Sequence, residues 1–412
     1  MAERSAHATI KGYFYQFDKT ILELLEATSP DSSVVVEGIE DIDLNDGIVG
    51  SLTQCKYYEG TEYVHSVIKD AVIYMLRHFK TAGCPADQTL RYRIYGHYKK
   101  GQGKLPASLN LTFLKKHFLS YSKEKVAHEV HTELGVSDPE LSRFLELLDI
   151  NLRAPAYDAQ QKTVYDSITR SLPNGSVADA QTFYYPRAIN VIQKLAVEAD
   201  VSKRTIKKAD FIAAVDRKEV VLSRWLREKF GDEHYSKSIK RKHFTFSGLK
   251  IPKGSRVFAI DIAGEFDLPK AAALLNKIGT LFSHKEHKRT LENERFCPYI
   301  ILNGIQDTDM ATLKAALYRQ GIFFEDGHPF LGSDFYPARL TAPLTPGFPI
   351  KLKFIPSAEH LAPSFAGVHG TSIEVFDFFK TSPLDRRFRL PDAVHNEIQI
   401  PHTYFISEIL KS

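Results

Sequence analysis

The chain has 412 residues, of which 43% are hydrophobic and 25% are charged, a composition typical of a globular protein with two or three domains. No apolar run is long enough to cross a bilayer, and the N-terminus lacks the charged-then-apolar pattern of a signal peptide, so we expect a cytoplasmic protein with no membrane partner. The formal net charge of +4 excludes a globally basic surface, and any contact with nucleic acid must therefore come from local clusters of lysine and arginine.

The first predicted element is an amphipathic helix over residues 13–27. Its apolar side carries Phe14, Phe17, Ile21 and Leu24, at the spacing of successive helical turns. Polar side chains follow another side of the same helix: Tyr13, Gln16, Thr20 and Glu23.

Two strands with a turn between them are predicted next, over residues 34–44 and 51–57. Side chains two residues apart share a face of a strand, so the acidic residues of the first strand can point the same way. An amide and an ammonium share a face of the second strand. The side chains that this arrangement brings within reach of one another are Glu37, Asp41, Asp43, Gln54 and Lys56.

These residue types suit the hydrolysis of a phosphodiester. A divalent cation prefers hard oxygen ligands, which Asp41, a backbone carbonyl and the Gln54 amide oxygen can supply. Lys56 can position or deprotonate an attacking water. We place Asp41 as the central carboxylate, and Asp43 is the alternative, because a shift of the strand register by one pair would put it at the same depth.

Three motifs in this order resemble those of the PD-(D/E)XK nuclease superfamily, in the variant whose last motif reads Q-x-K. They are GYFYQ at residues 12–16, EGIED at residues 37–41 and QCK at residues 54–56. The order is similar to that in the nuclease domains of anti-phage double-stranded DNA endonucleases, both those of CBASS systems and the nuclease subunit of Lamassu systems. The resemblance covers about the first third of the chain.

The resemblance implies a restriction-endonuclease-like mixed sheet flanked by helices and a Mg²⁺- or Mn²⁺-dependent endonuclease that cuts double-stranded DNA. Asp41 and Gln54 would hold the metal, Glu37 or Asp43 would assist, and Asp41, Gln54 and Lys56 would form the catalytic set. Gln16 and Glu23 of the preceding helix are candidate secondary ligands in such a fold. The departure from the parent pattern is Gln54, where many relatives have glutamate, which leaves one or two metals possible.

The resemblance also bears on partners. CBASS nucleases of this kind carry a cyclic-oligonucleotide sensor on the same chain, whereas Lamassu nucleases are held by an SMC-like ATPase subunit and a small accessory subunit. A single small α/β unit favours the Lamassu arrangement. We expect a homo-oligomer on activation, because cutting both strands needs two active sites on one duplex.

We expect an α/β (α+β) protein in three parts. Residues 1–150 form the nuclease domain, residues 151–250 form a helical middle segment with basic patches, and residues 251–412 form a small α/β domain with a regulatory or oligomerisation role. In the middle segment we expect helix over residues 203–230, with Trp225 packed inward.

Other polar residues give weaker signals. Asp261 ends a predicted strand, where open α/β sheets place ligands, although a loop start explains it as well. His284 and His287 have the spacing of one helical turn but no third ligand nearby. The three cysteines have no CxxC spacing, and Cys55 should face the core.

Two other readings of the same residues stay open. Residues 34–44 could be an ordinary edge strand with a solvated acidic face. The chain could also be a catalytically weak DNA-binding or assembly subunit of a multi-protein defence complex, in which the same fold supports a partner. A metal-dependent cleavage assay on supercoiled plasmid separates these readings from a nuclease.

Overall fold

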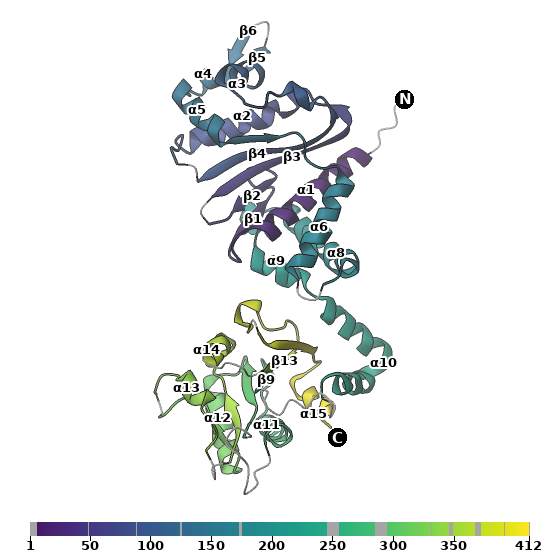
Figure 1. Cartoon of the computed structure of the whole chain (residues 1–412), viewed down its shortest axis with the longest axis vertical. Helices are drawn as coiled ribbons and strands as arrows, with labels where there is room; N and C mark the ends of the chain where they lie inside the picture. The colour runs from purple at the N-terminus through teal and green to yellow at the C-terminus, as the bar shows by residue number, and fades with distance from the viewer. Residues whose placement is uncertain are drawn as a thin grey trace. The chain divides into compact units, whose positions relative to one another are not determined.

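The computed structural model of the chain forms two compact units, Met1–Arg217 and Lys218–Ser412 (Figure 1). The mixed α/β architecture predicted from the sequence is confirmed. No helix of the described residues is long and apolar enough to span a membrane. The structure describes residues 6–47, 49–87, 89–123, 126–172, 175–244, 255–284, 295–330, 332–345, 349–366, 372–390 and 392–411.

The first unit is built on a mixed six-stranded sheet in the order β7-β4-β3-β2-β1-β8. β4 runs parallel to both β3 and β7, whereas β1, β2, β3 and β8 pair antiparallel. The strands are β1 Ser33–Val36, β2 Ile42–Asn45, β3 Gly50–Glu62, β4 Leu90–Lys100, β7 Leu148–Asn151 and β8 Thr205–Lys207.

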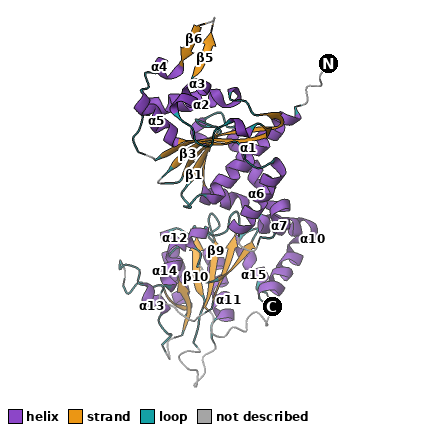
Figure 2. Ribbon diagram, turned by 45° about the horizontal axis from the view of Figure 1, so that its top comes forward, coloured by secondary structure: helices purple, strands orange, loops and turns teal. Residues whose placement is uncertain are grey.

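Helices cover both faces of this sheet (Figure 2). One face packs on α2, α3 and α5, and its core includes Leu52 of β3 with Tyr92 and Ile94 of β4. The other face packs on α1, α6, α8 and α9, and its core includes Val34 and Cys55, so the prediction that Cys55 faces the core is confirmed. The helices are α1 His7–Glu26, α2 Ser66–Thr81, α3 Leu111–Phe118, α4 Val130–Glu133, α5 Asp138–Leu147, α6 Tyr157–Ser171, α7 Val177–Asp179, α8 Tyr185–Ala196 and α9 Lys208–Val215; β5 Ser120–Lys123 and β6 Val126–Glu129 form a separate hairpin.

Three local predictions differ from the structure. The strand predicted over residues 34–44 is two strands, β1 and β2, that pair with each other across a turn. Within the stretch predicted to be helical, Thr205–Lys207 is the strand β8, which extends the sheet beside β1. The prediction that Trp225 packs inward is wrong, because 50% of its surface is exposed.

The predicted middle segment, residues 151–250, does not form a unit of its own. Its helices as far as Arg217 belong to the first unit, where α6 and α8 contact α1. Its last helix, α10 Lys218–His243, belongs to the second unit, and a left-handed residue, Gly231, interrupts it.

The second unit is a parallel six-stranded sheet in the order β11-β12-β10-β9-β13-β14. Its first strand, β9, lies in the middle, and the chain builds outward on one side before it returns to the other. Its strands are β9 Ser255–Asp261, β10 Tyr299–Asn303, β11 Phe323–Glu325, β12 Ile350–Phe354, β13 Ile373–Phe379 and β14 Val394–Gln399, and its remaining helices are α11 Leu268–Phe282, α12 Asp307–Arg319, α13 Pro337–Thr341, α14 Leu361–Phe365 and α15 Ile406–Ile409.

Candidate functional site

The turn between β1 and β2 is held by the carboxylate of Asp43. One oxygen accepts the backbone N–H of Ile39 at 2.6 Å and the other accepts that of Glu40 at 3.0 Å. Glu37 has a positive φ of 53°, and a Cβ on Gly38 would lie 2.2 Å from the Asp43 carboxylate. Asp43 therefore closes the turn, and Gly38 leaves room for it.

Asp41 lies where β2 separates from β3. The ladder between these strands ends at the pair Ile42 and Thr53, so the next backbone N–H of β3 that faces β2 needs another acceptor. One oxygen of Asp41 accepts the N–H of Cys55 at 2.7 Å and also a hydrogen bond from the Gln54 amide nitrogen. The structure thus brings Asp41 and Gln54 together as predicted, and it separates their roles from that of Asp43.

Lys56 lies two residues beyond Gln54 on β3, so their side chains share one face of the strand. The pKa values of Glu40 and Asp41 are both raised, and the positive charge of Lys56 opposes this rise. In the part of the chain that the structure describes, Lys56 makes no ion pair or hydrogen bond. The ammonium is therefore close to the acidic turn and remains available to another group.

Glu40 is a member of this group that the sequence analysis did not single out. Only 7% of its surface is exposed, and its Oε1 is buried with no hydrogen-bond partner. Burial raises the pKa of Glu40 to about 8, and the charges of Asp41 and Asp43 act in the same direction. Its position inside the EGIED motif was the available signal, but strand alternation directed attention to Glu37 and Asp41.

Burial also raises the pKa of Asp41, to about 6. The Cys55 N–H opposes this shift, the nearby Glu37 charge adds to it, and Lys56 and Gln54 oppose it. Asp41 and Glu40 therefore lie close together, and the charge of Lys56 does not cancel the rise in either pKa.

Glu37 connects this group to α1. Its Oε1 accepts a hydrogen bond of 2.6 Å from the amide of Gln16, and its backbone N–H donates to the Asp41 carbonyl at 3.0 Å. Gln16 thus reaches the site through Glu37. The other secondary candidate, Glu23, instead pairs with Lys19 at 2.8 Å and lies 3.9 Å from Arg93, which is a structural ion pair on the α1 face.

The site offers a divalent cation the carboxylate of Asp41 and the amide oxygen of Gln54. Over the described residues, no three His, Cys, Asp or Glu side chains are grouped so that they could hold a metal by themselves. The Gln54 amide oxygen has no hydrogen-bond partner among these residues and can add a neutral oxygen ligand. A cation beside Asp41 would also favour the ionised form of both carboxyls, whose pKa values are raised mainly by burial.

The remaining candidates lie in the second unit. Asp261, at the end of β9, lines a crevice of about 310 Å³ with Asn303, which ends β10, and Asp377, which lies within β13. Buried Asp377 accepts the N–H of Leu384 at 2.6 Å, and burial raises its pKa to about 7. This is the edge of a parallel sheet at which ligands bind, at the point where strand order reverses.

Of the two histidines, the structure describes only His284. The ring of His284 is buried against the backbone of Phe296, with its Nδ1 2.9 Å from the carbonyl oxygen. His287 lies outside the described residues.

Comparison with known proteins finds no family model and no curated protein that matches the chain. Solved structures of the Acinetobacter baumannii Cap4 SAVED/CARF-domain containing receptor are similar at low level. The one with the cyclic trinucleotide 2'3'3'-cAAA has 11% identity and a TM-score of 0.30 over 97% of this chain and 92% of that chain. The corresponding Moraxella osloensis receptor has 13% identity and a TM-score of 0.29, over 88% of this chain and 90% of that chain. Similarity at this level carries no argument about fold, activity or ligand.

Proposed function

We propose that the chain is a Mg²⁺- or Mn²⁺-dependent endonuclease that hydrolyses double-stranded DNA as the effector of an anti-phage or anti-plasmid defence system. The observation that carries the proposal is the meeting of Asp41, Gln54 and Lys56 at one point of the sheet, in the order and fold position that the PD-(D/E)XK resemblance implies. The defence role rests on that resemblance alone.

The chemistry follows from the residues. When bound, the divalent cation supplies a Lewis acid for a phosphate oxygen. Asp41 and the Gln54 amide oxygen would hold it, and Glu37 and Glu40 would add negative charge nearby. Lys56 holds the attacking water and offsets the charge that grows on the phosphoryl oxygens. The water oxygen forms a bond to phosphorus and releases a proton to solvent while an ester P–O bond breaks, and the departing oxygen takes up a proton from solvent.

The assignment of Asp43 changes within this proposal. Both of its oxygens accept N–H groups of the turn, so we assign it to holding Asp41 and Glu40 in place and not to the metal. The order of importance is therefore Asp41 first, with Glu40 added to the set that the sequence indicated.

The test is nicking of supercoiled plasmid by the full chain with Mg²⁺ or Mn²⁺ and with EDTA. Lys56→Ala should lose cleavage and still fold, because the ammonium is partly exposed and makes no ion pair among the described residues. Lys162→Ala, an exposed lysine on α6, is the matched control and should cleave normally.

Wild-type cleavage by Lys56→Ala would remove Lys56 from the site. A wild-type chain that binds DNA but never cleaves it favours the other candidate function, a catalytically weak DNA-binding or assembly subunit. That candidate stays open because the described residues contain no group of three His, Cys, Asp or Glu side chains that could hold a metal by itself.

We further infer that the second unit controls the first. A nuclease without sequence specificity needs restraint in its host, and the crevice at Asp261 and Asp377 offers acceptors for a small ligand with several hydrogen-bond donors. An SMC-like ATPase subunit, a small accessory subunit and a second copy of the chain on activation are the partners that the Lamassu resemblance implies.

A further inference from the structure

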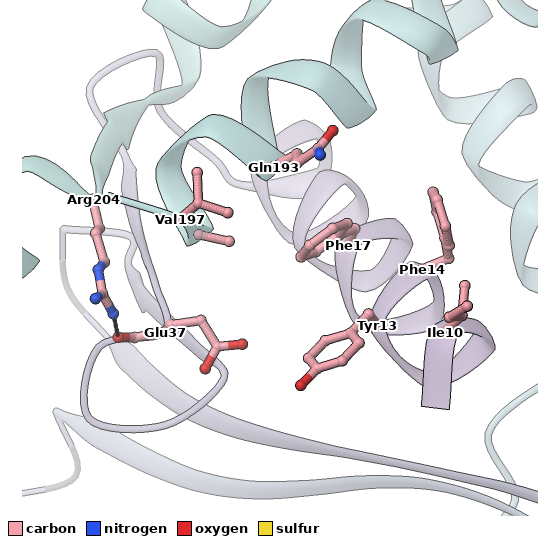
Figure 3. A pocket seen from close by; sticks show the side chains of 9 residues that line it. Ile10, Tyr13, Phe14, Phe17, Glu37, Gln193, Val197 and Arg204 are labelled. Atoms are coloured by element: carbon pink, nitrogen blue, oxygen red, sulfur yellow. Dashed lines mark hydrogen bonds between the residues drawn. The ribbon is translucent and has the colours of Figure 1, made fainter. Parts of the chain in front are cut away.

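A cavity of about 550 Å³ lies beside Glu37, between α1 and the C-terminal end of α8 (Figure 3). Its volume is within the range of small-molecule sites, about 300–1,000 Å³. All of its lining residues belong to the first unit. The side chains that matter to its chemistry are Tyr13, Phe14, Phe17, Glu37, Val197 and Arg204.

One wall of the cavity is aromatic and exposed. Tyr13 and Phe14 are neighbours on α1 and Phe17 lies one turn further on, and 54% of the Tyr13 surface is accessible. Val197 faces them from the end of α8 and is also exposed. Exposed apolar side chains around a concave surface cost free energy in water, and they mark a place where a flat apolar group binds.

The opposite end is polar and fixed in position. Arg204 donates from Nε to the Glu198 carbonyl and from Nη1 to the Glu37 carbonyl, each at 2.7 Å. These bonds use two of its five N–H groups, and the described residues give the others no partner. Glu37 accepts from Gln16 through Oε1 only, so its second oxygen can accept from an amino group.

Glu37 links the cavity to the candidate site. Its side chain lines the cavity, and its backbone N–H donates to the Asp41 carbonyl at 3.0 Å.

We propose that this cavity takes one unstacked nucleotide of the DNA strand, with its base against Tyr13 and Phe14 and a phosphate at the guanidinium of Arg204. Stacking on an aromatic ring accepts any base, and a guanidinium pairs with phosphate oxygens through two N–H groups. Positive charge beside an aromatic wall suits a nucleotide better than an apolar peptide, which would offer no anion to the guanidinium of Arg204. The proposal rests on the proposed function only in taking DNA as the ligand.

The test measures binding of a single-stranded oligonucleotide with one 2-aminopurine to the full chain in EDTA, where no cleavage occurs. We expect quenching of the 2-aminopurine on binding, and an affinity about fivefold or more weaker for Tyr13→Ala, since stacking contributes about 1–3 kcal/mol per base. Tyr74→Ala is the matched control, because Tyr74 is 52% exposed on α2, which covers the other face of the sheet. Arg204→Lys keeps the charge and should weaken binding by a smaller factor.

Equal affinity of wild type and Tyr13→Ala, or no binding by the wild type, overturns the proposal and leaves the cavity to a protein segment. Plasmid cleavage is scored separately. A chain that never cleaves but needs Tyr13 for binding retains the cavity and loses the nuclease. A chain that cleaves and ignores Tyr13 retains the nuclease and loses the cavity.

Discussion

Replacing Asp41 with asparagine should stabilise the metal-free protein while abolishing cleavage. Burial raises the pKa of Asp41 from 3.8 to about 6, and the charge of Glu37 adds to this effect. Because the folded-state pKa lies above the unfolded value, ionisation of Asp41 weakens the folded state as pH rises through this window. The loss is absent below pH 3.8 and complete above pH 6.

The difference between these two pKa values corresponds to roughly 3 kcal/mol, which is an upper bound for the gain from removing the charge at pH 8. Asparagine also keeps the local hydrogen bonds. A single oxygen of Asp41 accepts from both Cys55 and Gln54, and the amide oxygen of asparagine can take that position. Its NH₂ group takes the place of the other carboxylate oxygen and can donate to a neighbouring carboxylate such as Glu37.

The measurement is urea denaturation in EDTA at pH 8 and pH 4, with plasmid cleavage in Mg²⁺ as the second readout. Asp41→Asn should be more stable than wild type at pH 8, equal to it at pH 4, and inactive. Asp46→Asn is a control of opposite sign. Burial acts against the charge of Asp46 too, but hydrogen bonds from Ser32 and Thr28 dominate and hold its pKa low. A loss of stability in Asp41→Asn at pH 8, or a gain of the same size at pH 4, refutes the reasoning.

Asp43→Ala should lower the free energy of unfolding by about 1–3 kcal/mol in urea denaturation and reduce cleavage only in part, because it leaves two turn N–H groups without their acceptor. Asp18→Asn should raise the melting temperature at pH 8 and leave it unchanged at pH 4, since burial raises the pKa of Asp18 to about 7 and only Tyr185 donates to it. A fragment that ends at Arg217 should fold alone but lose the assembly of the full chain in light scattering; a fragment that still assembles and cleaves like the intact chain places control in the first unit.

The approach of Asp41 to Gln54 could be predicted from the sequence, because strand alternation and a short antiparallel connection both act over few residues. The turn at Glu37–Asp41 could not. It depends on a carboxylate, that of Asp43, folding back over Gly38, and the pattern EGIED reads equally well as extended chain. Glu40 was missed for the same reason, since its burial follows from the turn and not from strand periodicity.

Contacts between distant segments were the other limit. Thr205–Lys207 lies in a basic stretch with helical spacing, yet it pairs with β1, about 170 residues earlier in the chain. Lys208 then donates to the carbonyls of Leu25 and Ala27 at the end of α1, which fixes the start of α9 there. Tertiary hydrogen bonds decide such short strands, and local propensity does not. The prediction for Trp225 failed for another reason: α10 leaves its ring at the surface, beside Lys229.

In the proposed function, protons and a divalent cation compete for the same carboxylates. The protein gives Asp41 two hydrogen bonds and leaves the buried Oε1 of Glu40 with none, while Lys56 is the neighbouring positive charge. Burial is the main cause of the raised pKa values of both carboxyls, and the charges of neighbouring carboxylates add to it. A cation that binds at the proposed site would have to displace any protons that Asp41 and Glu40 carry. Metal affinity should therefore fall as pH drops below about 6, because the carboxyl group of Asp41 is then protonated.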